Sequence, residues 1–270
     1  MLQEKCTSID QAIATASRIA KKWGDGLPDP DPTLDVWFRG ANDTFDLLPS
    51  AYWRTRGKEY EYSAFATFKQ LARNVSKTSG FSKWDYYCLA RHHGIPTRLL
   101  DWSEGILQAL FFALDGWDGS GTPCIWILRP DALNQLSLEL DLILASDTET
   151  ERGRATEHWL PELEPNGKIN IDGNHRSNEK PIAIYPARTN PRIVGQRGTF
   201  TVHGTDTRPL NEILCAEPEF QDSLARIDLE GLDRDITRRT MHYLGLRQSA
   251  IYPDADHIAK DIRFIYGWGD

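Results

Sequence analysis

Apolar residues recur at helical spacing through much of the first part of the chain. Between residues 8 and 23 they are Ile9, Ala12, Ile13, Ala16, Ile19, Ala20 and Trp23, and Gly24 follows as a stop signal. This pattern predicts an amphipathic helix over 8–23. The same reasoning predicts further helices over 60–77, 104–115, 231–243 and 254–263. In the segment 60–77 the apolar side consists of Phe65, Phe68, Leu71, Ala72 and Val75.

Two serines stand where helices are expected to begin. Ser82 is followed three residues later by Asp85, an acidic variant of the capping box, and predicts a helix from there to about Arg91. Ser103 stands before the apolar run "GILQALFFAL", so we expect it to cap the helix over 104–115. A proline-punctuated loop, "GLPDPDPTL", separates the first helix from the apolar segment 35–39.

Strand-like runs follow mainly after residue 116. Segments 35–39, 123–128, 141–146, 181–185, 197–203 and 225–229 are short, rich in β-branched or aromatic residues, and bounded by turn residues. The polar stretch 147–180 is expected to be an inserted loop or excursion. Helices first and strands later predict an α+β fold, with a central split or antiparallel sheet and an N-terminal helical layer. We expect residues 1–34 to form an N-terminal helix and linker, and 35–270 to form one domain.

Composition narrows the classes of protein that this chain represents. Of 270 residues, 40% are hydrophobic and 26% charged, which is typical of a globular chain, and the net charge of -8 argues against nonspecific phosphate binding. The longest apolar run is too short to cross a bilayer, and the first ten residues show no signal sequence. The isolated cysteines, without C-x-x-C spacing, predict reduced thiols. We therefore expect a cytoplasmic protein with no membrane partner.

The segment "WFRG", residues 37–40, ends an apolar strand on a permanently charged side chain. Arg39 must find an anionic or polar partner, which is either a carboxylate at the edge of the core or an anionic ligand. Gly40 permits a close approach of another backbone or a positive φ.

The densest polar cluster is "ARHHGIPTRLLDWS", residues 90–103, between two apolar helices. Gly94 and Pro96 predict an ordered loop there, and such loops commonly carry binding groups. Arg98 and Asp101 either pair with each other or face a ligand. The adjacent histidines lack the i, i+4 spacing of a helical metal pair, so we expect no metal site.

Five motifs in this order resemble the FRG domain, a bacterial and phage-associated family named for Phe38-Arg39-Gly40. They are "WFRG", "ARHHGIPTRLLDWS", "ALFFAL", "RIVGQRGTFTVHG" and "IYPDADHIAKDI", and they extend from about residue 35 to 263. Their order is similar to that of ADP-ribosyltransferase folds, which cleave the nicotinamide bond of NAD. The resemblance therefore implies an ADP-ribosyltransferase-like fold and NAD as cofactor.

The resemblance also implies roles for particular residues. Arg39 would hold a phosphate or ribose of NAD. The catalytic residues implied are Arg39, Thr97, Asp101 and Gln196. The nucleotide-binding residues implied are Phe38, Gly40, His92, His93, Arg98, Trp102 and Phe200, with Phe111 and Phe112 packed beneath the cleft. We expect Arg39, the segment 91–101 and Gln196 to meet at one cleft.

One position departs from the ADP-ribosyltransferase pattern. Gln196 stands where those proteins have a glutamate that stabilises an oxocarbenium-like transition state. Either another carboxylate (Asp101, Glu157 or Glu212) takes that role, or the domain binds a nucleotide without turning it over.

Three functions follow as hypotheses. The first is an NAD-dependent ADP-ribosyltransferase that acts as a toxin or phage-defence effector on a protein or nucleic-acid acceptor, with an antitoxin or regulatory partner. The second is an NAD glycohydrolase on the same scaffold. The third is a non-enzymatic nucleotide- or protein-binding module.

Overall fold

A computed structural model describes residues 1–27, 29–31, 33–74, 78–146, 150–161, 169–171, 173–187 and 191–268. Within these ranges the strands form an eight-stranded sheet in the order β1-β10-β4-β2-β3-β9-β8-β5, and a separate β6–β7 pair. The strands are β1 (Leu2–Cys6), β2 (Trp37–Ala41), β3 (Leu99–Ser103), β4 (Cys124–Leu128), β5 (Leu144–Ala145), β6 (Ile169–Ile171), β7 (Asn174–Arg176), β8 (Ile182–Tyr185), β9 (Gly198–Val202) and β10 (Leu224–Leu229). The two edge pairs, β1–β10 and β5–β8, are parallel, and the neighbouring pairs between them are antiparallel.

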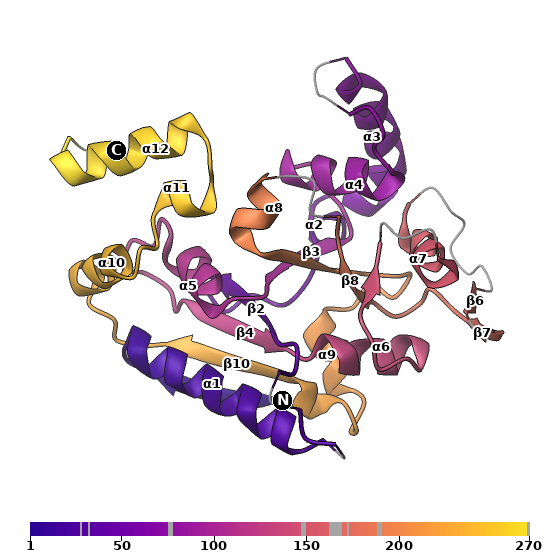
Figure 1. Ribbon diagram of the computed structural model, residues 1–270, viewed down its shortest axis with the longest axis horizontal. Coiled ribbons are helices and arrows are strands. Elements are labelled where there is room, and N and C mark those ends of the chain that lie inside the picture. Colours follow the sequence, from indigo (N-terminus) through magenta and orange to yellow (C-terminus); the bar gives the residue numbers. More distant parts are fainter. Residues whose placement is uncertain are drawn as a thin grey trace.

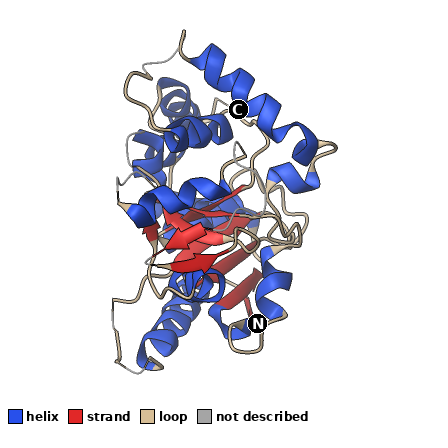
Figure 2. Ribbon diagram, turned by 90° about the vertical axis from the view of Figure 1, so that its right-hand side faces the viewer, coloured by secondary structure: helices blue, strands red, loops and turns tan. Residues whose placement is uncertain are grey.

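Helices cover both sides of this sheet (Figures 1 and 2). They are α1 (Ile9–Asp25), α2 (Ser50–Trp53), α3 (Gly57–Ala72), α4 (Lys83–His92), α5 (Ile106–Leu114), α6 (Pro130–Leu138), α7 (Glu151–Ala155), α8 (Pro191–Gln196), α9 (Leu210–Cys215), α10 (Arg234–Tyr243), α11 (Gln248–Ile251) and α12 (Ala255–Tyr266), with 3-10 turns at Thr156–Trp159 and Gln221–Ser223. The mixed fold with a mainly antiparallel central sheet agrees with the prediction from sequence.

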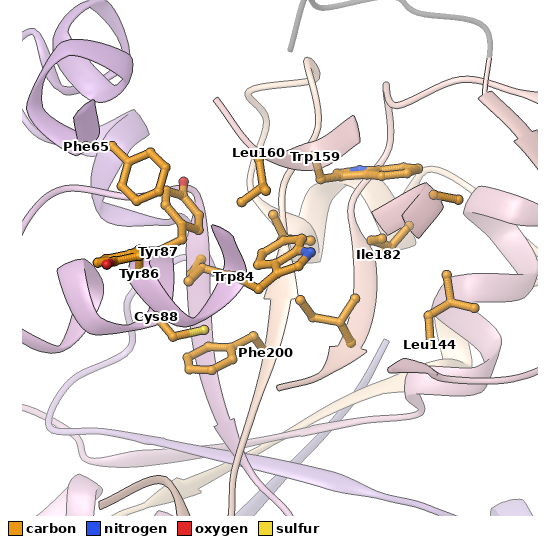
Figure 3. Close-up of a cluster of buried hydrophobic side chains, with 14 of the residues drawn as sticks. Phe65, Trp84, Tyr86, Tyr87, Cys88, Leu144, Trp159, Leu160, Ile182 and Phe200 are labelled. Carbon is orange, nitrogen blue, oxygen red and sulfur yellow. The ribbon is translucent and has the colours of Figure 1, made fainter. Parts of the chain in front are cut away.

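Alternation along the strands divides the core between two faces of the sheet. In β4, Trp126 packs in a cluster with residues of α6 and α9, whereas Ile125 and Ile127 point the other way. The opposite face, which we call the α4/α5 face, packs against α1 and α5 over one half of the sheet and against α3 and α4 over the other half. Figure 3 shows the second of these clusters, where Trp84 and Tyr87 of α4 lie among aliphatic and aromatic neighbours.

β2 and β3 form a narrow junction at the centre of the sheet. In the described chain their register consists of one pair, Phe38 opposite Ser103, whereas β2 and β4 pair from Trp37 to Ala41. Continuing the antiparallel register beyond Phe38 would bring Gly40 opposite Asp101, and that pairing is not formed. The sheet is therefore partly split at the position of the Phe-Arg-Gly triplet.

Several local expectations are wrong. Residues 90–103 are the end of α4, a turn and the central strand β3, rather than a loop. Ser103 belongs to β3, and α5 begins after Gly105 without a side-chain cap. The stretch 147–180 contributes to the core through residues such as Trp159 and Ile169, which are buried, so it is not simply an inserted loop. Residues 147–149, 162–168 and 172 of that stretch lie outside the described residues.

The N-terminal segment contributes more than the expected helix and linker. β1, which the sequence patterns did not predict, pairs in parallel with β10 from Leu2–Ala225 to Cys6–Leu229. α1 lies along β10 on the same side of the molecule (Figure 1), and its predicted apolar residues Ile9, Ala12, Ala16 and Ile19 are buried. Residues 1–34 thus complete the sheet formed by later strands.

Candidate functional site

A small pocket lies where α4, α8, β3 and β9 meet on the α4/α5 face. It is lined by Asp101 of β3, Phe200 of β9, Gln196 of α8, and Arg91 and His92 of α4, among others. Asp101 and Phe200 share this side of the sheet because they are direct partners in the β3–β9 register. The pocket has a volume of about 70 Å³, which is much smaller than the ~300–1,000 Å³ typical of pockets that enclose a whole drug-sized ligand.

The carboxylate of Asp101 lies close to two arginine side chains, those of Arg91 and Arg39. Its Oδ2 accepts a hydrogen bond from Arg91 Nε at 3.1 Å and a second from Arg91 Nη2. Arg39 Nη1 lies 3.8 Å from the same oxygen. Burial raises the pKa of Asp101, but the charges and hydrogen bonds of Arg91, together with Arg39, hold that pKa below its ordinary value. The carboxylate is therefore ionised at neutral pH.

Arg39 reaches Asp101 through the split in the sheet. Its Nη1 donates a hydrogen bond to the backbone carbonyl of Asp101 at 2.7 Å. That carbonyl faces the strand junction that β2 leaves unpaired, so the guanidinium replaces a missing ladder hydrogen bond. Burial and the nearby Arg91 lower the pKa of Arg39, but a guanidinium stays charged at any biological pH. The structure thus gives Arg39 a polar partner at the edge of the core.

Gln196 ends α8 and brings a neutral amide to the pocket. Its chain direction is fixed by Arg197, which has a positive φ of 48° and whose carbonyl accepts a hydrogen bond from Glu104 N at 3.0 Å. The part of the chain that the structure describes offers the Gln196 side chain no hydrogen-bond partner. Its amide is therefore available to a ligand in the pocket.

Arg98 is engaged elsewhere, with a carboxylate that the sequence analysis did not identify. Its Nη2 lies 2.8 Å from Glu61 Oε2, and its backbone N–H also donates to Glu61 Oε1 at 2.9 Å. Glu61 is 1% exposed and Arg98 15% exposed, and the Tyr87 hydroxyl donates to the same carboxylate. Arg98 and Asp101 therefore do not pair with each other, and Arg98 forms a buried ion pair that joins the residue before β3 to α3.

The remaining predicted residues divide between pocket and core. His92 and Phe200 line the pocket. Thr97 is fully buried, with its backbone N–H donating to Ser50 Oγ at 3.1 Å. Trp102 points to the α6/α9 side, where its Nε1 donates to Thr201 Oγ1 at 3.1 Å. Neither Thr97 nor Trp102 lines the pocket.

Gly40, Phe38 and His93 also lie outside the pocket lining. A Cβ at Gly40 would lie 1.8 Å from the carbonyl oxygen of Ala109, so this glycine allows α5 to lie directly on β2. Phe38 packs with the same cluster as α5. The ring of His93 packs against those of His92 and Phe68. Phe111 and Phe112 contact Tyr252, away from the Asp101 pocket.

Among the carboxylates considered as substitutes for the missing glutamate, Asp101 lines the pocket. Glu157 instead pairs with Lys83 at 2.9 Å, and Glu212 is in the first turn of α9. Asp85 also lines the pocket, but it accepts hydrogen bonds from the Ser82 N–H and hydroxyl as part of the predicted capping box. The structure therefore brings Asp101 and Gln196 together without either of the other candidates.

The described residues were also compared with what a metal site and a membrane span require. Within the described ranges, no group of three or more His, Cys, Asp or Glu side chains is arranged to hold a metal ion. In the same ranges, the helices are too short or too polar to cross a bilayer.

Comparison with known proteins gives one family match. Residues 35–119 match the sequence model of the FRG domain, which supports the FRG resemblance for this segment. The matched segment extends from just before β2 to beyond α5 and so includes Arg39, Arg91 and Asp101, whereas Gln196 lies outside it. Neither a search of curated proteins nor a search of solved structures gave a match.

Proposed function

We propose that the Asp101 pocket binds the nicotinamide–ribose end of NAD, and that the protein transfers ADP-ribose to a macromolecular acceptor. The observation that carries this proposal is that Asp101 and Gln196, nearly a hundred positions apart in sequence, line the same pocket. Asp101 supplies there the charge that Gln196 lacks. Because the pocket is small, the proposal puts only the reacting end of NAD in it and leaves the adenosine half outside.

The reaction breaks the glycosidic bond between C1′ of the ribose and the nicotinamide nitrogen. The bonding electron pair leaves with nicotinamide, which departs as a neutral molecule, and positive charge develops on the ribose. An ionised carboxylate stabilises that charge, which is the role we assign to Asp101. The Gln196 amide hydrogen-bonds a ribose hydroxyl. The acceptor nucleophile then forms the new bond to C1′ and loses its proton to solvent water.

The cations around Asp101 have a positioning role in this proposal. Arg91 holds the carboxylate through its Nε and Nη2, and the guanidinium of Arg39 fixes the backbone of the same residue. The wider role as a toxin or phage-defence effector, with a protein or nucleic-acid acceptor and an antitoxin or regulatory partner, rests on the FRG resemblance.

A non-enzymatic nucleotide-binding module is the second candidate. The observation that favours it is that Asp101 is already paired with Arg91, which reduces the charge that it offers to a transition state. In this alternative the pocket holds a nucleotide without cleaving it. The remaining hypothesis, hydrolysis of NAD, requires water as the acceptor in the same geometry.

The test measures nicotinamide release from NAD by chromatography and ADP-ribose addition by intact-mass analysis, with and without cell lysate. We expect release that depends on lysate, and a loss of about 100-fold or more in Asp101→Asn. Gln196→Ala should lose activity as well. Asp222→Asn is the matched control, because Asp222 is 82% exposed.

Each other outcome selects an alternative. Nicotinamide release at the same rate without an acceptor identifies a glycohydrolase. NAD binding that Gln196→Ala weakens, without release of nicotinamide, identifies the binding module. Full activity of Asp101→Asn removes Asp101 from the reaction.

A further inference from the structure

A second and larger pocket lies at the end of the molecule where the C-terminal helices gather. It is formed by the end of α5 together with α10, α11 and α12, which lie close together in Figure 1. Its volume is about 450 Å³, within the ~300–1,000 Å³ range of small-molecule sites. It shares no lining residue with the Asp101 pocket.

Positive charge dominates this pocket although the whole chain carries a net charge of -8. Its cationic lining residues come from α10, α12 and the turn before α11, and they are Arg234, Arg238, Arg247, Lys260 and Arg263. Two carboxylates, Asp115 and Asp261, also line it. Across the described parts of the chain, none of the five cations forms an ion pair. A cluster in which cations outnumber carboxylates in this way attracts a multiply charged anion.

The two carboxylates already have partners on α11. Asp261 accepts hydrogen bonds from the backbone N–H groups of Gln248 and Ser249 at 3.1 and 2.9 Å. Asp115 accepts a hydrogen bond from the Gln248 side chain. These contacts fix α11 between α5 and α12, and they leave the arginine and lysine groups of the lining available to a ligand.

Aromatic and apolar side chains complete the lining. The guanidinium of Arg238 lies 4.3 Å from the ring centroid of Phe264, which remains 37% exposed. Trp117, Phe111 and Met241 line the same pocket. A flat ring system therefore has apolar surface to pack against, next to forked donors that suit phosphate oxygens.

We infer that this pocket binds a nucleoside di- or triphosphate, with its phosphates on the arginine and lysine side chains and its base against the aromatic ones. The volume of about 450 Å³ favours a small molecule over a nucleic-acid strand or an acidic peptide, which would need an extended groove. The inference stands independently of the proposed reaction, because it depends on a different set of residues.

The test is isothermal titration calorimetry of the full chain with ADP, ATP, adenosine and inorganic pyrophosphate. We expect ADP and ATP to bind, adenosine not to bind, and pyrophosphate to bind more weakly than ADP. Arg247→Ala and Arg263→Ala should each weaken ADP binding by about tenfold or more, since each removes a charge-assisted hydrogen bond. Arg263→Lys should recover part of that loss.

Two controls separate this site from other sources of binding. Lys22→Ala removes an exposed cation from the last turn of α1 and should leave ADP binding unchanged. Gln196→Ala should also leave it unchanged, because Gln196 belongs to the other pocket. Melting temperatures within a few degrees of the parent protein confirm that each variant is folded.

Other results overturn the inference. They are no detectable heat with ADP or ATP at millimolar concentration, equal weakening by Lys22→Ala and Arg263→Ala, and loss of binding in Gln196→Ala with retention in Arg263→Ala. A short oligonucleotide or a polyglutamate peptide that binds more tightly than ATP, and loses that binding in Arg263→Ala, overturns it in favour of a polymeric partner.

Discussion

Arg39 Nη1 lies 2.7 Å from the backbone carbonyl oxygen of Asp101 and joins β2 to β3 where the two strands do not pair. The same Asp101 presents its side chain to the pocket shared with Gln196. A single arginine therefore bridges the split in the sheet and positions the charged group of the candidate site.

Replacement of Arg39 by alanine should lower stability as well as activity. The change leaves the Asp101 carbonyl unpaired and removes a charge near its side chain, so we expect a loss of about 1.5–3 kcal/mol in the free energy of unfolding. Arg39→Lys should recover only part, because it keeps the charge but loses the planar fork. Urea denaturation measures both variants.

The control for Arg39 is Arg18→Ala, which removes a 56% exposed guanidinium from a surface pair with Glu4. Its stability should change by less than about 1 kcal/mol. An Arg39→Ala protein as stable as the parent but inactive would instead identify Arg39 as a ligand clamp.

The buried pair between Arg98 and Glu61 should be far more sensitive than a surface pair of the same composition. Glu61→Gln keeps the side-chain shape but leaves Arg98 without its counter-ion, at a cost of about 3–5 kcal/mol. Glu59→Gln is the matched control, since Glu59 pairs with Arg56 and both side chains are more than half exposed. It should cost less than about 1 kcal/mol. Equal effects on chemical denaturation would show that the Arg98 pair is unimportant for stability.

Gly40→Ala should prevent close packing of α5 on β2. The added methyl group meets the backbone of Ala109 and Ala113, which cannot move away as a flexible side chain can. We expect a loss of about 3 kcal/mol or more in unfolding free energy. Gly198→Ala is the control, because its nearest neighbours at 3.7 Å and beyond leave ordinary contact distances. Thermal melting distinguishes the two, and a normal melting temperature for Gly40→Ala would contradict the packing described here.

The folded protein should become less stable as the pH is lowered, because of His203. Burial lowers the pKa of His203 to about 3 in the folded protein. The positive charge of Arg98 adds a smaller decrease, and the negative charge of Asp206 opposes it. The unfolded chain binds that proton near pH 6.5, so it holds more protons than the folded chain between these values. The free energy of unfolding should therefore decrease by about 1.4 kcal/mol for each pH unit below about 6.

Urea denaturation between about pH 4.5 and pH 7 measures this slope. His203→Gln removes the titrating ring and should flatten the curve in that window. Asp101 and Asp206 contribute at lower pH, because their pKa values lie below the ordinary value for aspartate and their stabilisation is lost only as pH falls through those values. An unchanged slope in His203→Gln would assign the dependence to other groups.

Local patterns predicted the helices well where caps and periodicity agreed. The Ser82–Asp85 capping box and the apolar spacing of 8–23 located α4 and α1 almost to the residue. β3 was missed because Asp101 is a charged residue in the middle of the sheet, where apolar residues are usual. β1 was missed because exposed Gln3 and Lys5 interrupt it, which is typical of an edge strand.

The site was predictable only in part, because local patterns do not show which residues meet from distant parts of the sequence. Motif order predicted that Arg39, Asp101 and Gln196 meet at one cleft. Asp101 and Gln196 line the same pocket, whereas Arg39 contacts the backbone carbonyl of Asp101 and is not part of the pocket lining. The partner of Arg98 was not foreseen, because Glu61 is 37 positions away, on α3. One signal was present: Glu61 stands four residues before buried Phe65, on the buried side of its helix. An acidic residue in such a position requires a buried cation.

The parallel pairing of β1 with β10 sets an order of assembly during synthesis. Leu2–Cys6 leaves the ribosome long before Leu224–Leu229, so β1 has no strand to join until almost all of the sheet has been made. α1 also lacks part of its packing surface until then, because its buried face packs on β10 as well as on α5. The alternating polar residues of β1 help to prevent this strand from pairing with other chains before β10 is present. We therefore expect β1 to dock only after the much later β10 has been synthesised, and hydrogen exchange on nascent chains would show the amides of β1 protected only after residue 229 has emerged.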